Sequence, residues 1–309
     1  MRVAIATEPT GIGNVELVDR PDPVPGPGQV LVRVHCAGVG PWDVGMLSGG
    51  FPGMATPFVP GQEISGVVET AGEGTDARPG QRVFATTFPT GGGFGELALV
   101  DAARMAPMPE KADFPEAAAL VIAAGTAHEG LIDRGHLRPD QTVLVTAAAG
   151  GVGSAAVQIA AATDARVFGV ASPRNHDYLR NLGASETFDY HDPDWVRQVL
   201  AACPGGVDLL MDCAGGETRD RALEAVRDNG RASLIVIQDP TPPLSRGITA
   251  ESFAAHVDRE RLGALAELVD SDRLRPHIEA VLPLDQVREA LSRVAGKHTR
   301  GKVVVRITE

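Results

Sequence analysis

The 309-residue chain has few cysteines and no long apolar run, and both shortages limit what it can be. Its 3 cysteines, Cys36, Cys203 and Cys213, are odd in number and show no CxxC spacing. Because a disulfide framework or a four-thiolate zinc site needs more of them, neither is expected. No stretch approaches the roughly 20 uninterrupted apolar residues that span a bilayer, and the opening MRVAIATEPTG has no apolar signal core. The sequence therefore predicts a cytoplasmic protein without a membrane segment.

Positive charge is also scarce. Against 40 acidic side chains stand 28 basic ones, so the formal net charge is -12. Only Lys111, Lys297 and Lys302 are lysines. A chain of this charge would repel a nucleic-acid backbone unless its cations were gathered on one face. Nucleic acid is therefore not expected as a partner, and the 43% of hydrophobic residues is that of a globular chain long enough for two cores.

Two regions with different patterns divide the chain. From residue 1 to about 100, short β runs alternate with turns rich in Gly and Pro, which indicates a small, partly closed β-barrel. From about residue 115, alanine-rich helical stretches alternate with β runs such as QTVLVTA, ARVFGVA and VDLLMDC. That alternation is typical of a parallel sheet with crossover helices. The last forty or so residues show a strand, helix, strand pattern, so we expect the tail to return to the first region.

The most informative segment is a β run at residues 142–147, followed by GVGSAA at 151–156 and an apolar helix. This GxGxxA pattern predicts a dinucleotide site: Gly151 allows a tight turn, Gly153 lets the backbone approach a pyrophosphate, and Ala156 lets helix and strand pack closely. The residues predicted to hold the phosphates are Ala149, Gly150, Gly151, Val152 and Gly153. The alternative is a tight packing turn that binds no ligand.

The end of the second β run selects the cofactor. An NAD site places Asp or Glu there, about 20 residues after the first glycine, to hold the ribose 2′-hydroxyl. Here the stretch is VASPRN at residues 170–175, which has no carboxylate. Ser172 can hydrogen-bond a 2′-phosphate and Arg174 can neutralise it, so NADPH is favoured over NADH. The alternative is that both residues merely begin the next helix.

Further segments strengthen this interpretation. They are AGVGPWD at 37–43, PGQEISGVVETAGEG at 60–74, PGQRVF at 79–84, AAAGGVG at 147–153 and RGKVVVRI at 300–307. Together they resemble the medium-chain dehydrogenase/reductase superfamily, and within it the zinc-free, zeta-crystallin-like branch of NADPH:quinone oxidoreductases. The resemblance implies an α/β chain with a GroES-like β-barrel catalytic domain over residues 1–118 and 263–309. It also implies a Rossmann domain, a doubly wound parallel sheet that binds NADP(H), over residues 119–262.

The alcohol dehydrogenase branch of this family holds a catalytic zinc, and the resemblance places Gly40, Gln62 and Ala123 at its ligand positions. None of the three can ligate zinc as the family ligands would, so no metal site is expected. Because zinc polarises the carbonyl or alcohol oxygen in that chemistry, its loss favours a conjugated acceptor whose own π system spreads the developing charge. The expected activity is therefore an NADPH-dependent, zinc-independent reduction of a quinone or α,β-unsaturated carbonyl, carried out by a homodimer.

Four residues are candidates for the catalytic site. Asp43 is expected near the acceptor, with helix capping as the alternative, and Trp42 is expected to stack on a flat acceptor, with core packing as the alternative. Gln62 would hydrogen-bond the acceptor oxygen or have a structural role. The resemblance places Thr126 beside the nicotinamide, where it serves both catalysis and cofactor binding, and places Tyr190 near the 2′-phosphate.

Two other functions stay open at this point. An enoyl-thioester or biosynthetic-intermediate reductase would use the same fold. A non-catalytic NADPH-binding sensor or structural protein would bind without turnover, and Gly40 permits this because it lacks the Asn contact that zinc-free relatives often offer the substrate. The shape of the acceptor pocket is expected to depend on two irregular segments, residues 46–58 and 239–247.

Overall fold

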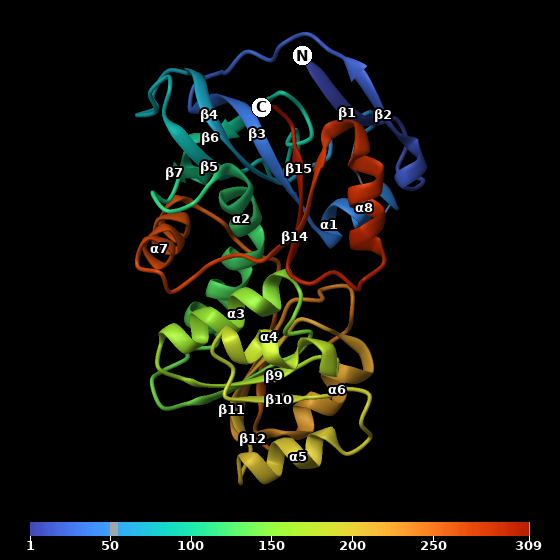
Figure 1. The fold of residues 1–309 in the computed structure, drawn as a ribbon, viewed down its shortest axis with the longest axis vertical. Helices are drawn as coiled ribbons and strands as arrows, with labels where there is room; N and C mark the ends of the chain where they lie inside the picture. The colour runs from blue at the N-terminus through green and yellow to red at the C-terminus, as the bar shows by residue number, and fades with distance from the viewer. Residues whose placement is uncertain (50–54, 309) are drawn as a thin grey trace. The chain divides into compact units, whose positions relative to one another are not determined.

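The structure is a computed structural model that describes residues 1–49 and 55–308, and they form two compact units. Unit 1 comprises Met1–Ile122 and Val257–Glu309, and unit 2 comprises Ala123–His256. Unit 1 therefore holds both the blue start and the red end of the chain, whereas unit 2 holds its green to orange middle (Figure 1). These boundaries lie a few residues from the domain limits expected from the sequence.

Unit 1 contains a seven-stranded sheet in the order β14-β15-β3-β4-β5-β7, with β6 also paired to β3, and a separate β1-β2 pair. The strands are β1 (Arg2–Ala6), β2 (Val15–Asp19), β3 (Gln29–Val39), β4 (Glu63–Ala71), β5 (Arg82–Thr86), β6 (Leu97–Asp101), β7 (Met105–Pro107), β14 (Ile278–Pro283) and β15 (Lys302–Arg306). Along one edge, β3 pairs antiparallel with β6 at Gln29 to Arg33 and with β15 at Cys36 to Val39. The closing strand of the chain thus lies in the N-terminal sheet, as its alternation predicts.

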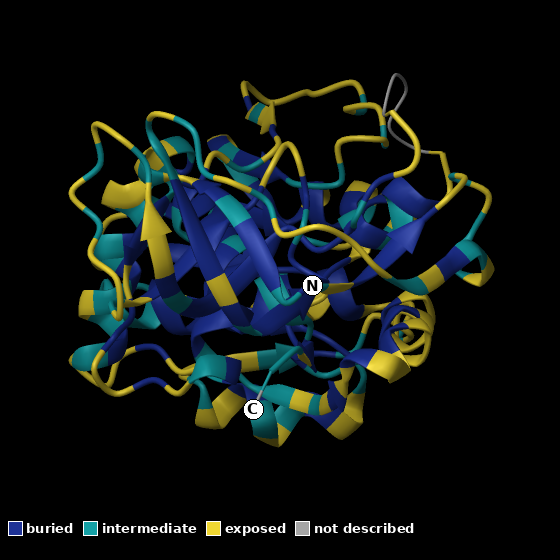
Figure 2. Ribbon diagram, turned by 90° about the horizontal axis from the view of Figure 1, so that it is seen from above, coloured by how far each residue is buried: buried dark blue, intermediate teal, exposed yellow. Residues whose placement is uncertain are grey.

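The core of unit 1 joins the inward side chains of these strands to α8 (Val287–Ala295). The buried residues of α8 are Val287, Ala290, Leu291 and Val294, whose spacing puts them on one helix face. The remaining helices of this unit include α1 (Pro41–Leu47), α2 (Phe114–His128), which continues into unit 2, and α7 (Arg259–Asp270). In Figure 2 most of the strand ribbon is dark blue, and many of the loops around it are yellow and exposed.

Unit 2 contains a six-stranded sheet in the order β10-β9-β8-β11-β12-β13, and every neighbouring pair is parallel. The strands are β8 (Thr142–Val145), β9 (Arg166–Val170), β10 (Glu186–Phe188), β11 (Val207–Asp212), β12 (Val226–Leu234) and β13 (Thr249–Ser252). The helices between them are α3 (Gly151–Ala162), α4 (His176–Asn181), α5 (Trp195–Ala202) and α6 (Gly216–Glu224). This order confirms the doubly wound parallel sheet predicted from the alternation.

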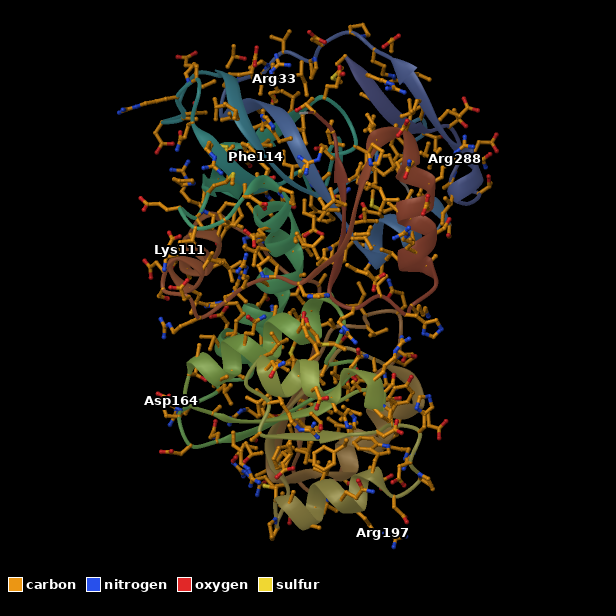
Figure 3. All side chains as sticks on the ribbon, in the orientation of Figure 1. Arg33, Lys111, Phe114, Asp164, Arg197 and Arg288 are labelled. Atoms are coloured by element: carbon orange, nitrogen blue, oxygen red, sulfur yellow. The ribbon has the colours of Figure 1, made fainter. Side chains whose placement is uncertain are left out.

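Burial explains the apolar runs of unit 2. All four residues of β8 are buried, as expected for a central parallel strand that is covered on both faces. Trp195 is fully buried and packs in the core cluster with Phe168 and Phe188. Charged side chains such as Asp164 and Arg197 of unit 2, and Arg33 of unit 1, lie outside these cores (Figure 3).

Within the described parts of the chain, none of the helices combines the length and apolar character that a membrane crossing needs.

Candidate functional site

The glycine loop connects the end of β8 to the start of α3. Gly150 is the N-cap of α3 and has an extended backbone, with φ -77° and ψ -178°. The first N–H groups of a helix have no partner inside the helix, and together with the helix dipole they favour a phosphate. A Cβ on Gly153 would lie 2.4 Å from the carbonyl oxygen of Ala147. Only glycine at position 153 therefore lets α3 come this close to the loop. The start of α3 is therefore packed closely against the loop that precedes it.

One detail of the loop differs from the expectation. Its left-handed residue is Ala147, with φ 45°, whereas Gly150, Gly151 and Gly153 are not among the glycines with positive φ. The tight turn therefore comes from Ala147 and not from Gly151. The requirement for glycine at position 153 is steric, and Ala156 is fully buried as the close packing of helix and strand requires.

The residues predicted to meet a 2′-phosphate follow two neighbouring strands. Ser172 comes after β9 and is half-buried, and Arg174 is exposed two positions later. Tyr190 follows β10, is 38% exposed, and has its ring centroid 4.0 Å from that of His191. Because β9 and β10 are parallel neighbours, their carboxyl ends meet at one edge of the sheet. Thr126 is buried in α2 and is 6% exposed.

In unit 1, Asp43 is completely buried in the first turn of α1. Its two carboxylate oxygens accept hydrogen bonds from the backbone N–H groups of Gly40 at 2.9 Å and Gly61 at 3.1 Å. The pKa of Asp43 is raised to about 7, mainly by burial and also by the nearby carboxylate of Glu63, whereas these hydrogen bonds and the charge of Lys302 lower it. Asp43 therefore has the helix-capping role that the sequence analysis gave as the alternative. It also connects α1 to Gly61, the residue before Gln62.

Trp42 and Gln62 each have a buried polar atom that lacks a partner within the described part of the chain. Among the described residues, no hydrogen bond reaches Nε1 of Trp42 or Oε1 of Gln62, although Nε2 of Gln62 donates to Sδ of Met46 at 3.4 Å. Buried polar atoms are nearly always paired, so each exception calls for an explanation. The indole ring packs on Gly40, and Nζ of Lys302 lies 4.8 Å from its centroid.

Sequence reasoning missed two residues beside Trp42, namely Lys302 and Glu63. Nζ of Lys302 donates to the carbonyl oxygen of Val39 at 2.8 Å and to Oε1 of Glu63. Oε2 of Glu63 accepts the backbone N–H of Ile122 at 2.9 Å. The available signal was a lysine at the start of the apolar run KVVVR in a chain with only three lysines. A buried lysine needs a counter-ion, but the sequence does not show which carboxylate supplies it.

The residues at the zinc-ligand positions do not fit a zinc ion. Gly40 and Ala123 have no donor atom in their side chains. At position 40 a side chain would also lack space, because a Cβ there would lie 2.2 Å from Cε2 and Cζ2 of Trp42. Across residues 1–49 and 55–308, His, Cys, Asp and Glu side chains do not gather in groups of three or more that could hold a metal ion.

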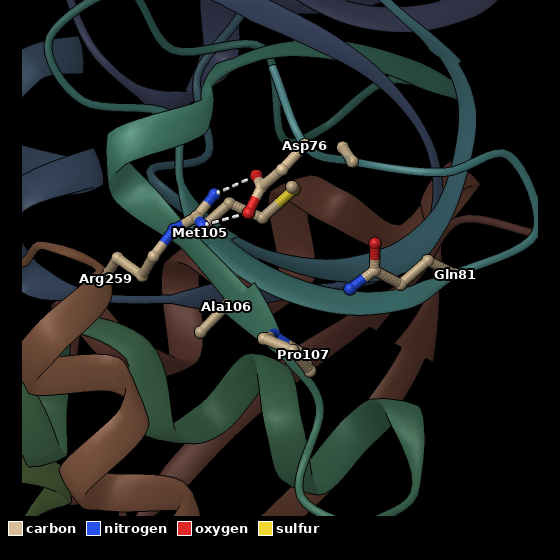
Figure 4. A pocket seen from close by; sticks show the side chains of 7 residues that line it. Asp76, Gln81, Met105, Ala106, Pro107 and Arg259 are labelled. Carbon is tan, nitrogen blue, oxygen red and sulfur yellow. Dashed lines mark hydrogen bonds and ion pairs between the residues drawn. The ribbon is translucent and has the colours of Figure 1, made fainter.

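A cavity of about 70 Å³ lies in unit 1, and none of these residues lines it. Met105, Ala106 and Pro107 form part of its wall, and Arg259 donates to both oxygens of Asp76 beside it, at 2.7 and 2.8 Å (Figure 4). Ligand pockets usually measure about 300–1,000 Å³. The cavity is therefore too small for a dinucleotide or a quinone. Residues 46–58 are one of the two segments expected to shape an acceptor pocket. Within that segment, residues 50–54 lie outside the described residues.

Comparison with known proteins places the chain in a family. Residues 26–110 match the family described as alcohol dehydrogenase GroES-like domain, and residues 182–305 match zinc-binding dehydrogenase. The synaptic vesicle membrane protein VAT-1 homolog of Rattus norvegicus is 31% identical, over 99% of this chain and 84% of its own. The chain belongs to the medium-chain dehydrogenase/reductase superfamily. Within this superfamily, the quinone oxidoreductase of Homo sapiens is 29% identical over 92% of this chain and 90% of its own.

Solved structures of the superfamily agree with this assignment. A crystal structure described as an NAD-dependent alcohol dehydrogenase has a TM-score of 0.93 and 28% identity, and the match covers 100% of both chains. A mycobacterial protein in complex with NADPH has a TM-score of 0.89 and 26% identity, over 99% of this chain and 100% of that one. The fold is thus a GroES-like domain with a six-stranded Rossmann sheet, as predicted. The chain is an NAD(P)-dependent oxidoreductase of this superfamily and is similar to quinone oxidoreductases.

Proposed function

We propose that this chain is an NADPH-dependent reductase that transfers hydride to a quinone or an α,β-unsaturated carbonyl compound without a bound metal ion. The observation that carries the cofactor choice is the carboxyl end of β9. Residues 171–176 hold Ser172 and Arg174 and contain no carboxylate that would pair with the 2′-hydroxyl of NAD. The solved relative that is complexed with NADPH supports the same choice.

When NADPH is bound, it supplies the hydride from its nicotinamide ring. The residues of unit 2 then hold and orient it. The backbone N–H groups of Ala149 and of residues 151–153 would meet the pyrophosphate, whereas that of Gly150 donates to the carbonyl oxygen of Ala147 at 3.0 Å. Ser172, Arg174 and Tyr190 would meet the 2′-phosphate. Thr126 would contact the nicotinamide region, as the family resemblance implies. These assignments depend on the glycine loop being a phosphate cradle, which the close approach of Gly153 to Ala147 supports.

The residues of unit 1 would stabilise the acceptor oxygen. Negative charge develops on that oxygen as hydride reaches a conjugated carbon, and donors already in place stabilise it. The N–H of Trp42, which has no partner among the described residues, is such a donor. Nε2 of Gln62 carries a second N–H besides the one that it donates to Met46, whereas Oε1 of Gln62 is an acceptor and cannot take this role. Because the indole packs on Gly40 and beside Lys302, we assign its N–H, and not its ring face, to the acceptor. Asp43 would act as a positioning residue, and water would supply the proton.

The activity is tested by mixing the purified protein with NADPH or NADH and a panel of quinones and enones. We expect loss of the nicotinamide absorbance with NADPH and at least one acceptor. Tight NADPH binding without oxidation by any acceptor would instead support a sensor. Dialysis against a chelator should leave the rate unchanged, and a rate that is lost and then restored by Zn²⁺ would contradict the metal-free reaction.

The role of Trp42 is tested by Trp42→Phe, which removes the N–H and keeps an aromatic ring. We expect kcat to fall at least about tenfold, because a donor to the developing oxyanion is lost, while the Kd for NADPH stays unchanged. Trp195→Phe is the control, since Trp195 lies in the core of unit 2 and should affect stability but not kcat. An unchanged kcat in Trp42→Phe would remove the indole N–H from the site.

The homodimer and the cytoplasmic location expected from the sequence belong to the same proposal, as does the absence of nucleic acid among the partners. β13 forms one edge of the parallel sheet, and the outward-facing groups of an edge strand can pair with a second copy. Light scattering on the purified protein tests the dimer. A monomer at all concentrations used would contradict it.

A further inference from the structure

The strand order of unit 2 reverses at β8, which is where open parallel sheets have their ligand crevice. The chain runs outward from β8 through β9 to β10, and it then crosses back to β11 on the other side of β8. In open parallel sheets, ligands bind outside the carboxyl ends of the strands at the point where the order reverses. Two buried polar side chains meet at this point, Thr146 directly after β8 and Asp212 at the end of β11. The hydroxyl of Thr146 donates to Oδ1 of Asp212 at 2.6 Å.

Asp212 also holds the loop that follows its own strand. Its oxygens accept the backbone N–H of Gly215 at 3.3 and 3.1 Å, and Oδ1 accepts that of Ala214 at 3.3 Å. The Thr146 hydroxyl in turn accepts the N–H of Cys213 at 2.9 Å. Residues 213–215 are therefore fastened to the end of β8, which leads directly into the glycine loop. Burial raises the pKa of Asp212, and the hydrogen bonds from Thr146, Ala214 and Gly215 oppose that rise.

The network continues to the loop after β12. The N–H of Gly216 donates to Oδ2 of Asp239, and the side chain of Arg219, which is only 6% exposed, lies 3.5 Å from the same oxygen. Gly215 has a φ of 72°, a left-handed conformation that favours glycine, and a Cβ there would lie 2.7 Å from Oδ2 of Asp239. The loops after three adjacent strands, β8, β11 and β12, are thus joined through two carboxylates.

We propose that Asp212, through Thr146, is a positioning residue for the nicotinamide dinucleotide: it fixes residues 213–216 as one wall of the crevice opposite the glycine loop. This inference rests on the proposed function, because it presumes that the crevice binds the dinucleotide. A carboxylate suits the task because it accepts several hydrogen bonds at once, and the N–H groups that follow a strand end have no partner in the sheet. An asparagine would turn one acceptor into a donor that faces the N–H groups of the loop.

The chain offers a matched control on the same strand. Asp208 lies near the amino end of β11, and its Oδ2 accepts the N–H of Thr142, the first residue of β8, at 2.9 Å. Its Oδ1 accepts Nε of Arg227 at 2.7 Å. Asp208 and Asp212 therefore fasten β11 to β8 at opposite ends, but only the carboxyl end faces the crevice. A general structural role predicts similar effects for both residues, whereas positioning of the dinucleotide predicts a difference in its affinity.

The experiment measures the Kd for NADPH by nicotinamide fluorescence, together with thermal unfolding, for the wild type and four variants. We expect Asp212→Asn and Thr146→Val to raise the Kd about tenfold, which corresponds to about 1.4 kcal/mol. Asp208→Asn and the conservative Thr146→Ser should leave it within about twofold, even where Tm falls. The KM for the acceptor should stay unchanged in all folded variants.

Three outcomes would overturn the inference. The first is a Kd for NADPH in Asp212→Asn equal to that of the wild type. The second is a rise of this Kd in Asp208→Asn as large as that in Asp212→Asn. The third is a Thr146→Ser variant that binds NADPH as weakly as Thr146→Val. If Asp212→Asn does not fold, the comparison of Thr146→Val with Thr146→Ser decides. A wild type that does not bind NADPH would contradict the proposed function itself, and the wild-type measurement separates that failure from the failure of this inference.

Discussion

The ammonium group of Lys302 lies against the carboxylate of Glu63, and both side chains are buried, at 6% and 0% exposed. The two residues are 239 positions apart in the sequence. They meet because β15 and β4 both pair with β3, on opposite edges. Lys302 also donates to Val39, and Glu63 accepts from Ile122, so the pair connects the end of β3 to α2. These hydrogen bonds offset part of the cost of removing the two charged groups from water.

Removing one charge of this pair should destabilise the protein more than removing both. Lys302→Met leaves the carboxylate buried without its cation, and Glu63→Gln leaves the ammonium without its anion. Removal of one partner from a buried pair lowers the free energy of unfolding by about 3–5 kcal/mol. The double variant has no stranded charge, so it should lose less than the sum of the two single losses. Urea unfolding of the three variants measures this coupling.

Glu69 provides the control on the same strand. It lies on β4 and pairs with Arg33 of β3 at 3.0 Å, but the two side chains are 42% and 46% exposed. Exposed pairs contribute about 0–1 kcal/mol. Glu69→Gln should therefore change the free energy of unfolding by less than about 1 kcal/mol. Similar losses for Glu63→Gln and Glu69→Gln would contradict the role given to burial.

Asp43 should make stability depend on pH. Burial raises its pKa in the folded protein to about 7 from an ordinary value of 3.8. Between these values the folded state binds more protons than the unfolded state, so stability falls as the pH rises. The contribution of Asp43 is present in full below about pH 4 and is lost as the pH rises through about 7. Glu63 and Lys302 face this carboxyl group with opposite charges, and their electrostatic effects on its pKa are opposed.

Asn at position 43 cannot ionise, so Asp43→Asn isolates this effect. Urea unfolding at several pH values gives the free energy of unfolding of the wild type and of Asp43→Asn. The wild type should lose stability relative to the variant between about pH 4 and pH 7. A difference that stays constant over this range would show that Asp43 has no raised pKa.

The elements of the fold followed from local patterns in the sequence. The glycine pattern between two β runs predicted β8, α3 and β9, because strand periodicity, a helix start and a close packing contact are all local properties. The alternation in KVVVRI predicted a strand at the end of the chain, and β15 is that strand. The turn conformation at Ala147 was missed, since a left-handed alanine has no sequence signal.

The contacts that assemble the site did not follow from the sequence. Asp212 ends an apolar strand, but its partner Thr146 is 66 positions away and becomes visible only when β8 and β11 are known to be neighbours. The pairing of Lys302 with Glu63 likewise depends on the strand order in unit 1. Side-chain partners across a sheet are set by register and strand order, which local periodicity does not encode.

Arg174→Ala should change the cofactor preference. A hydrogen bond to a charged group contributes about 1.5–3 kcal/mol, so loss of the guanidinium should raise the KM for NADPH about tenfold or more. The KM for NADH, which has no 2′-phosphate, should stay within about twofold. Arg180→Ala is the control, because Arg180 lies on α4 and pairs with Asp177 at 2.8 Å. Steady-state kinetics with both cofactors check this, and equal changes for NADPH and NADH in Arg174→Ala would show that the cofactor assignment is wrong.

Gly153→Ala should disturb the glycine loop directly. The added methyl group would lie 2.4 Å from the carbonyl oxygen of Ala147 and 2.7 Å from Cα of Ala148. Since both are backbone atoms, α3 or the loop must shift, and we expect weaker NADPH binding by fluorescence titration together with a lower Tm. Gly263→Ala is the control: no atom lies within 4 Å of its added Cβ on α7, and alanine in a helix is favoured by about 1 kcal/mol. Wild-type NADPH affinity in Gly153→Ala would mean that the close approach of α3 to Ala147 is not what shapes the phosphate cradle.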